Sequence, residues 1–380
     1  MLRILILNYE YPPIGGGAGM VTQHLAEEFI KFDNEVTVIT TWFPEEAEYS
    51  RQDNLKIIRL KSKRKNTFQS NPFEMYDWIK KCKQYFTQNN IKDLYDVCLA
   101  NFTLPGGEVA LFLKQKYKLP YIVLSHGHDI PWAFPKQMLF YHSVTYFWIK
   151  KICTESVFNI VLSEELKRMA DRLIPNNKSK NIIIDNGFHL QKFKKQFSGH
   201  VLKIIFIGRL AEQKNPLLFL ESIKILKNKS IPYQIEIYGD GNLRKKMELY
   251  IQKEQLEHIQ FKGKTAHQEV IHALEVSDLL ISSSKSEGMA LAILEALSVG
   301  VYVIATDVSG NKKLIQENIN GNLIKQAKAQ LIAKKVEDFY YQKFTKNYTY
   351  SENYIKQLQE QFSWNKIACQ YLELLNQATF

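Results

Sequence analysis

Short runs of apolar residues rich in Val and Ile alternate along this chain with longer amphipathic stretches. Such runs are typical of buried parallel strands, and the stretches between them are typical of helical crossovers. The first half repeats this unit several times and predicts one doubly wound domain. Its strands are expected at 3–8, 35–40, 55–60, 96–100, 121–125, 158–162 and 181–184, and its helices at 18–32, 73–89, 106–117, 137–152 and 164–173.

A second set of alternating elements begins after a polar, charged segment at 191–200, which we interpret as a linker. Strands are expected at 203–207, 233–238, 278–281, 301–304 and 321–324, and helices at 216–228, 242–254, 267–275, 289–299 and 327–343. The tail from 351 to 377 keeps a helical period and predicts one more helix. We therefore expect a first domain at 1–196, a second at 197–355, and a terminal helix at 356–380 that could return to the first domain.

Composition narrows the class of partner. The length of 380 residues suits two ordinary domains, and 50 Lys and Arg against 39 Asp and Glu give a net charge of +11, which favours acidic or phosphorylated partners. Four scattered cysteines indicate reduced thiols and no metal site. The first apolar run, at 2–7, is too short for a signal peptide, and no run reaches the roughly 18 residues needed to span a bilayer. We expect a cytoplasmic protein, peripheral at most on the membrane.

Two carboxylates, Glu287 and Glu295, bracket an uncharged stretch that follows a serine run. Strong helix formers from Met289 onward predict a helix that starts close to that residue. The first amides of such a helix and the positive end of its dipole form an anion site. An elongated phosphate ester would fit between the two carboxylates, although an isolated pair at this spacing is more often a pair of solvated side chains.

Other candidate residues follow predicted strands, where open parallel sheets bind ligands. The second domain opens on a strand that ends at Gly208, followed by two cations, Arg209 and Lys214, that could neutralise a diphosphate. Glycine turns at 238–241 and 261–265 recur at the same edge. In the first domain, the glycine loop 15–19 follows the first strand and His126 follows another. A solvated turn, a flexible loop and a structural histidine are the alternatives for these features.

In their order along the chain, these segments resemble the family-4 retaining glycosyltransferases of the GT-B fold. The resemblance spans nearly the whole chain and implies two facing Rossmann-like, doubly wound parallel-sheet domains. It is carried by the glycine loop 15–19, Ser125-His126-Gly127, Asp185-Asn186-Gly187-Phe188, Gly208-Arg209 with Lys214, Tyr238-Gly239-Asp240-Gly241, the stretch 287–295, and Ala305-Thr306-Asp307-Val308-Ser309-Gly310.

The resemblance also implies roles for individual residues. Arg209 and Lys214 would hold the donor diphosphate, Glu287 would contact the sugar hydroxyls, and Glu295 would bind the ribose. His126 would face the sugar from the first domain. The remaining donor-site residues would be Gly16, Gly17 and Gly208 around the diphosphate, the amides of Met289, Ala290 and Leu291 on the phosphate, and Lys264 and Thr265 beside the base.

The reaction implied is transfer of a sugar, with retention, from a UDP- or GDP-linked donor to a glycan or lipid-linked acceptor in cell-envelope polysaccharide or lipopolysaccharide synthesis. No metal or other cofactor is required in that scheme. Four positions depart from the family pattern: His189, Tyr302, Lys312 and Lys313. They leave the donor base and sugar open.

Cations and aromatic residues mix at 59–85 and again at 132–151, which could form an anionic-membrane contact or simply a solvated face. Two alternatives to the transferase remain open. A nucleotide-sugar epimerase of GT-B architecture would also hold a diphosphate, but the glutamate stretch with Arg209 and Lys214 argues against it. A basic nucleic-acid-binding protein has only the net charge in its favour, since the sequence contains no recognisable module for that function.

Overall fold

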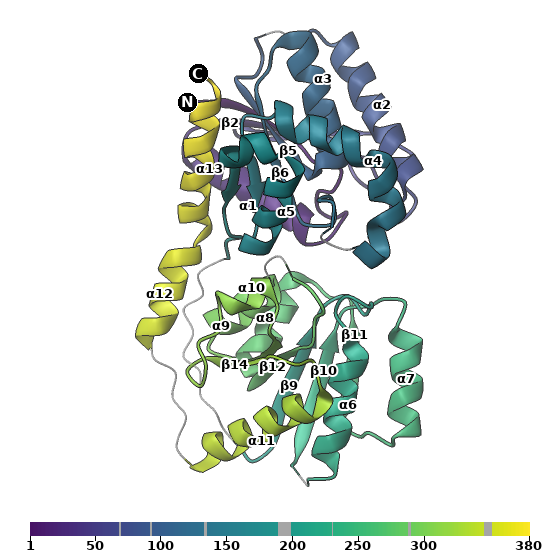
Figure 1. Ribbon diagram of the computed structural model, residues 1–380, viewed down its shortest axis with the longest axis vertical. Coiled ribbons are helices and arrows are strands. Elements are labelled where there is room, and N and C mark those ends of the chain that lie inside the picture. The colour runs from purple at the N-terminus through teal and green to yellow at the C-terminus, as the bar shows by residue number, and fades with distance from the viewer. Residues whose placement is uncertain are drawn as a thin grey trace. The chain divides into compact units, whose positions relative to one another are not determined.

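A computed structural model describes residues 1–67, 70–91, 93–132, 135–188, 199–229, 231–287, 290–345 and 352–380 (Figure 1). The chain divides into two compact units. Unit 1 contains Met1–Gly187 and Trp364–Phe380, and unit 2 contains Phe188–Ser363. The expected boundary at 196/197 falls outside the described residues.

Unit 1 is built on an eight-stranded sheet with the order β3-β4-β2-β1-β5-β6-β7-β8. All pairs are parallel except β3 with β4. The chain moves outward from β1 in one direction through β2 and β4, and in the other through β5 to β8, which makes the sheet doubly wound. Its strands are β1 (Arg3–Leu7), β2 (Glu35–Thr41), β3 (Tyr49–Gln52), β4 (Leu55–Leu60), β5 (Val97–Asn101), β6 (Tyr121–Leu124), β7 (Asn159–Val161) and β8 (Asn181–Ile183), and its helices are α1 (Gly17–Lys31), α2 (Pro72–Gln88), α3 (Glu108–Tyr117), α4 (Pro135–Glu155), α5 (Glu164–Leu173) and α13 (Trp364–Ala378).

Unit 2 repeats this plan with six parallel strands in the order β11-β10-β9-β12-β13-β14. The winding reverses between β9 and β12. The strands are β9 (Leu202–Ile207), β10 (Tyr233–Tyr238), β11 (Ile259–Gly263), β12 (Leu279–Ser282), β13 (Tyr302–Thr306) and β14 (Gly321–Ile324), and the helices are α6 (Pro216–Lys227), α7 (Arg244–Lys253), α8 (His267–Val276), α9 (Leu291–Ser298), α10 (Ser309–Lys312), α11 (Ala329–Thr345) and α12 (Glu352–Phe362).

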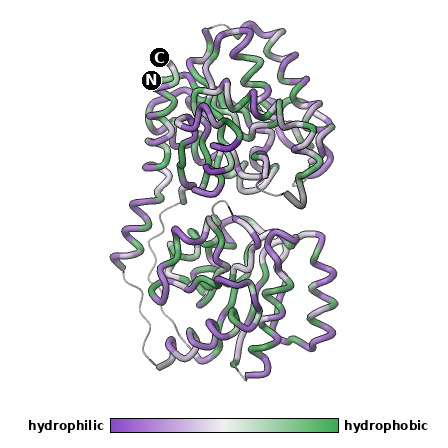
Figure 2. Tube along the Cα trace, in the orientation of Figure 1, coloured by the Kyte–Doolittle hydropathy of each residue, from purple (hydrophilic) through white to green (hydrophobic). Residues whose placement is uncertain are grey.

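Each unit buries its own apolar strands. The central strands β1, β5 and β13 are almost entirely inaccessible, as their uninterrupted apolar runs require. Figure 2 shows apolar segments gathered inside each unit and hydrophilic positions along outer helices such as α7, where Met247 is the buried residue. The two doubly wound sheets confirm the predicted α/β class.

The prediction of one continuous helix in the tail was wrong. The segment breaks at Ser363 into α12, which belongs to unit 2, and α13, which belongs to unit 1. The break has a local cause, because Phe188 N donates to Phe362 O at 2.9 Å and Phe188 forms a parallel bridge with Ser363. Beyond the break, α13 packs on α1 and β5 and buries Ile367, Tyr371 and Leu375 (Figure 1).

Two strands lay outside the predicted set. β3 (Tyr49–Gln52) is a polar edge strand, and β11 was expected only as a glycine turn. Helix α9 starts at Leu291, slightly later than the expected position near 289. In the described parts of the chain, no helix is both long and apolar enough to cross a bilayer.

Candidate active site

The winding reversal of unit 2 brings the carboxyl ends of β9 and β12 next to each other. Such a reversal opens a crevice at the sheet edge, where ligands bind in this class of fold. Gly208 follows β9 with φ of +147° and donates its backbone N–H to Tyr238 O at 2.9 Å. Leu210 N in turn donates to Asp240 O at 3.0 Å, so the turns after β9 and β10 are joined at this edge.

Lys214 and Glu287 meet at this edge of the sheet. Lys214 Nζ lies 2.5 Å from Glu287 Oε1, and the two side chains are 21% and 8% exposed. A Cβ on Gly208 would lie 3.1 Å from Lys214 Cε, so the glycine leaves the space that the lysine side chain occupies. Ser283 Oγ donates to the carbonyls of Lys214 and Asn215 at 3.0 and 2.9 Å, which fixes the backbone that carries the lysine. The structure thus brings together Gly208, Lys214 and Glu287 from segments distant in sequence.

Helix α9 begins beside this pair. Ala290 is its N-cap residue and offers no side-chain cap. The first intrahelical bonds are those of Ile293 and Leu294 to Ala290 O, so the amides of Ala290 and Leu291 precede them. Met289, the third amide of the predicted phosphate site, lies outside the described residues. These geometric features suit an anion at the start of α9.

Glu295 lies one turn into α9 and is 17% exposed on its side chain. Its Oε1 is 3.9 Å from Nδ1 of His267, the first residue of α8. Glu287 and Glu295 therefore have different surroundings, since one faces a lysine and the other faces a histidine. Sequence reasoning missed His267, which no motif or period distinguishes.

The remaining predicted residues of unit 2 lie on neighbouring turns. Arg209 is exposed, as is Lys264. Thr265 Oγ1 is buried and has no hydrogen-bond partner among the residues that the structure describes. Gly239 N donates to Gly263 O at 2.7 Å, which brings the turn that carries Lys264 and Thr265 to the same edge as Gly208.

In unit 1, the glycine loop lies between β1 and α1, at the winding reversal between β1 and β5. Gly16 and Gly17 are exposed, and a Cβ built on Gly16 would meet no atom of the described ranges within 4 Å. Gly16 is also the N-cap of α1 and provides no side-chain cap. The loop therefore leaves open space over the first amides of this helix.

His126 follows β6 and is held by Asn101, the last residue of β5. Its Nε2 is 3.1 Å from Asn101 Oδ1, which also accepts from Thr22 Oγ1 at 3.1 Å. The ring lies 4.7 Å from that of Phe102, centroid to centroid. Burial lowers the pKa of His126 to about 3, so the imidazole is neutral at physiological pH. A neutral ring can serve as a hydrogen-bond partner but carries no charge toward a phosphate.

Asp129 shapes the loop that carries His126, a role that sequence reasoning missed. Its Oδ1 accepts from the backbone N–H groups of His126 and Gly127, both at 3.1 Å, and its Oδ2 accepts from Thr103 N at 2.8 Å. Burial raises the pKa of Asp129, and the hydrogen bonds from Thr103 and Gly127 oppose that rise. The position of Asp129 three residues after His126 is the only sequence signal that could have pointed to it.

Two departures from the family pattern have structural explanations. Tyr302 is buried on β13, stacks on Phe339 with centroids 4.3 Å apart, and donates to Asn322 Oδ1 at 2.8 Å. Lys312 Nζ pairs with Asp307 Oδ1 at 3.3 Å. His189 lies outside the described residues. Across the described ranges, no group of three or more His, Cys, Asp or Glu side chains is arranged to hold a metal ion.

The two segments that mix basic and aromatic residues, 59–85 and 132–151, contain both buried and exposed side chains. Arg59 and Arg64 are buried, whereas Lys61, Lys63 and Lys65 are exposed. On α4, half-buried aromatic side chains pack against the core of unit 1, whereas a second set of apolar side chains is exposed. The half-buried residues are Tyr141, Tyr146 and Trp148, and the exposed residues are Leu139, Phe140, Val144 and Phe147.

Two family profiles match consecutive parts of the chain. Residues 15–192 match Glycosyltransferase Family 4, and residues 188–358 match Glycosyl transferases group 1. The chain is a family-4 glycosyltransferase. The two matches meet near the division between the two units, so each unit of the glycosyltransferase corresponds to one profile.

Relatives and solved structures agree with this assignment. An uncharacterized glycosyltransferase of Methanocaldococcus jannaschii is 26% identical over 96% of this chain and 95% of its own. An alpha-1,4-N-acetyl-D-galactosaminyltransferase of Campylobacter jejuni, whose name includes a PP-undecaprenol-linked glycan, is 26% identical over 85% of each chain. Sucrose-phosphate synthase of Thermosynechococcus elongatus superposes with a TM-score of 0.81 at 17% identity and covers 99% of both chains. The predicted GT-B fold class is confirmed.

Proposed function

We propose that this glycosyltransferase moves a sugar, with retention of anomeric configuration, from a UDP- or GDP-linked donor to a hydroxyl of a glycan or lipid-linked glycan. The observation that carries the donor half is the cluster of Gly208, Lys214 and Glu287 at the winding reversal of unit 2. It combines a cation, a carboxylate and the start of α9 at the edge where parallel sheets bind ligands.

The chemistry follows from where charge develops. When the bond between the anomeric carbon and the diphosphate breaks, negative charge collects on the departing phosphate. Lys214, the exposed Arg209 and the first amides of α9 stabilise that charge, which is the kind of electrostatic contribution that often dominates catalysis. Glu287 binds sugar hydroxyls and Glu295 binds the ribose, while His126 of unit 1 acts as a neutral hydrogen-bonding group. This scheme requires no metal, because the cations and amides supply the positive charge.

Retention follows if the acceptor approaches on the side from which the diphosphate leaves. The departing phosphate oxygen then accepts the proton of the acceptor hydroxyl, so no protein base is needed at that face. Comparing the anomeric configuration of donor and product by NMR tests this step. Inverted product would contradict it while leaving the transferase assignment intact.

The donor is tested without knowledge of the acceptor. We expect slow release of nucleoside diphosphate from at least one sugar nucleotide in a panel of UDP-, GDP-, ADP- and TDP-sugars. Glu295→Ala should chiefly weaken nucleotide binding, and Glu287→Ala should chiefly slow transfer. Equal effects of the two substitutions on both quantities would refute the division of roles.

We further propose that the acceptor is presented at an anionic membrane surface. Support comes from α4, where Leu139, Phe140, Val144 and Phe147 are 70 to 84% exposed and Lys151 is exposed near the helix end. Phe140, Val144 and Phe147 recur at helical spacing, so they share one face of the helix. The named Campylobacter relative, whose name includes a PP-undecaprenol-linked glycan, is consistent with such an acceptor.

Vesicle flotation tests this surface. The full-length protein should float with phosphatidylglycerol vesicles, and Phe140→Ser with Phe147→Ser should reduce the bound fraction severalfold. Half-buried Tyr146 is unsuitable for substitution because it packs on the core. Equal binding of the double variant and the wild type would contradict the proposed membrane contact.

A further inference from the structure

Arg64 differs from the other cations of its segment because its side chain is fully buried. It has 0% exposed side-chain area, whereas the neighbouring Lys63 and Lys65 are exposed. Its guanidinium carbon lies 4.7 Å from the ring centroid of Tyr9. Burying a charged group is costly unless it is paired and hydrogen-bonded, so the contacts of this guanidinium carry information about its role.

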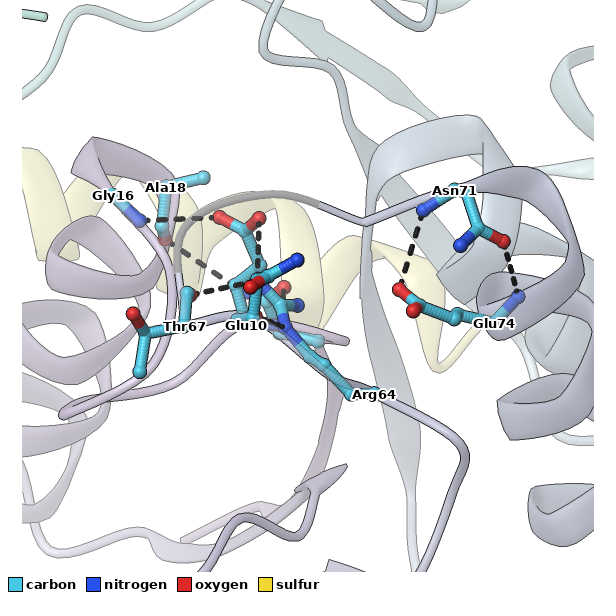
Figure 3. A network of polar contacts seen from close by, with 9 residues as sticks. Glu10, Gly16, Ala18, Arg64, Thr67, Asn71 and Glu74 are labelled. Carbon is cyan, nitrogen blue, oxygen red and sulfur yellow. Dashed lines mark hydrogen bonds and ion pairs between the residues drawn. The ribbon is translucent and has the colours of Figure 1, made fainter. Parts of the chain in front are cut away.

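Those contacts lead to the glycine loop along two routes (Figure 3). Arg64 Nη2 donates to Thr67 O at 2.8 Å, and the same carbonyl accepts from Gly15 N at 2.7 Å. Arg64 Nη2 also lies 3.6 Å from Glu10 Oε1, and the other carboxylate oxygen of Glu10 accepts from Gly16 N at 3.3 Å. The amides of Gly15 and Gly16 therefore donate to Thr67 and Glu10, and the Arg64 guanidinium contacts both of these acceptors.

The loop conformation depends on these acceptors. Gly15 has φ of +96°, and a Cβ at that position would lie 2.5 Å from Glu10 Cβ, so the Glu10 side chain packs directly on the loop. Gly16 lies on the other side, where no atom of the described residues comes within 4 Å of a built Cβ. With both amides fixed, the exposed backbone of Gly16 and Gly17 is presented in one conformation at the start of α1.

We propose that Arg64 is a positioning residue for the glycine loop, which it holds through Thr67 and Glu10 in the conformation that receives the donor. The proposal rests on the donor-binding role assigned to this loop above, and it adds a residue that touches no substrate. The planar guanidinium is suited to the task because Nε donates to Asn66 O at 2.8 Å while Nη2 faces Thr67 and Glu10, so these contacts diverge from one rigid plane. A lysine ammonium at the same place could not reproduce that geometry.

Hydrogen exchange tests the positioning directly and does not depend on activity. The amides of residues 14–17 are followed by mass spectrometry in the wild type, Arg64→Met, Arg64→Lys and Glu10→Gln, with Lys65→Met as the matched control from the same segment. Arg64→Met and Arg64→Lys should raise exchange in the loop by about tenfold or more, because methionine has no N–H donor and lysine cannot hold the Arg64 contacts in one plane, and Glu10→Gln should raise it less. Lys65→Met should leave it unchanged.

Unchanged loop exchange in a folded Arg64→Lys variant would overturn the proposal, and so would a uniform increase throughout β1 and β5, which would indicate general destabilisation. If Arg64→Met does not fold, Arg64→Lys and Glu10→Gln decide the question. In the release assay, the Arg64 variants should raise the KM for the donor about tenfold or more, while Lys65→Met keeps the wild-type value. Absence of donor turnover in the wild type would count against the proposed function, whereas exchange alone decides the role of Arg64.

Discussion

Neutralising Glu287 should tighten nucleotide binding and at the same time slow sugar transfer. In the structure, the Lys214 ammonium is already paired with Glu287 at 2.5 Å. A diphosphate that needs Lys214 must share it with this carboxylate and must also approach a negative charge. Glu287→Gln keeps the shape of the side chain and removes both obstacles.

The size of the effect follows from the burial of the pair. Two unit charges 4 Å apart interact by about 4 kcal/mol at an effective dielectric of about 20, and the cost of removing both groups from water offsets much of this energy. Lys214 is 21% exposed and keeps an oxygen of the glutamine as a partner, so the substitution should weaken the interaction between Lys214 and position 287 by only about 1 to 2 kcal/mol. At about 1.4 kcal/mol per factor of ten, UDP or GDP should bind roughly 5- to 30-fold more tightly.

Isothermal titration calorimetry with UDP and with GDP measures this change, and the release assay measures the loss of transfer. Lys214→Met should weaken binding of the same nucleotide by about tenfold or more. The matched control is Glu212→Gln, because Glu212 pairs with Lys285 at 2.7 Å on neighbouring loops but both side chains are more than half exposed. We expect no change in affinity for that variant. Weaker or unchanged nucleotide binding by a folded Glu287→Gln protein would refute the assignment of Lys214 to the diphosphate.

Three further predictions concern the glycine loop, His126 and Tyr302. Gly15→Ala should lower the free energy of unfolding by about 2 kcal/mol or more, because it forces a side chain into positive φ against Glu10. Gly16→Ala should change the free energy of unfolding by less than about 1 kcal/mol yet reduce donor turnover at least about tenfold. Denaturant titration measures the free energy of unfolding, and the release assay measures donor turnover. The pKa of His126 falls to about 3 in the folded state, below its ordinary 6.5, so its contribution to stability is complete above pH 6.5 and is lost as pH falls toward 3. Over that range the free energy of unfolding of the wild type should fall by up to about 1.4 kcal/mol per pH unit more than that of His126→Asn. Equal pH slopes of the two proteins would contradict this. Tyr302→Phe should cost about 1 kcal/mol of stability through its lost hydrogen bond and leave nucleotide affinity unchanged; a change in affinity would place the residue in the donor site instead.

Predictions from the sequence succeeded where one physical pattern dominated. Strands β1, β5 and β13 are nearly continuous apolar runs buried on both faces, and the sequence predicted them almost to their ends. β3 was missed because Tyr49–Gln52 is a polar edge strand whose pairing with β4 provides its order. The break at Ser363 was missed because helical spacing continues across it through Trp364 and Ile367, while the interruption depends on a bridge to Phe188.

The candidate site shows the same division. Gly208, Lys214 and Glu287 could be grouped from sequence, because all three follow strands whose carboxyl ends share one sheet edge. The roles of Glu10 and Arg64 could not, because their contact joins segments that neither periodicity nor motif relates. In the sequence, Arg64 is one cation in a basic run, and only the packing around Tyr9 distinguishes it from its neighbours.

The return of α13 to unit 1 determines the order in which the chain can fold during synthesis. Unit 2 is one uninterrupted stretch, and its ends lie side by side where Phe188 N donates to Phe362 O at 2.9 Å. Unit 1 lacks a helix until residues 364–380 have been synthesised, since Trp364, whose ring would lie 2.5 Å from a Cβ on Gly187, begins the segment that completes it. Unit 2 is therefore an inserted domain that can fold first, and a nascent chain completes unit 1 only after the whole of unit 2 has been synthesised.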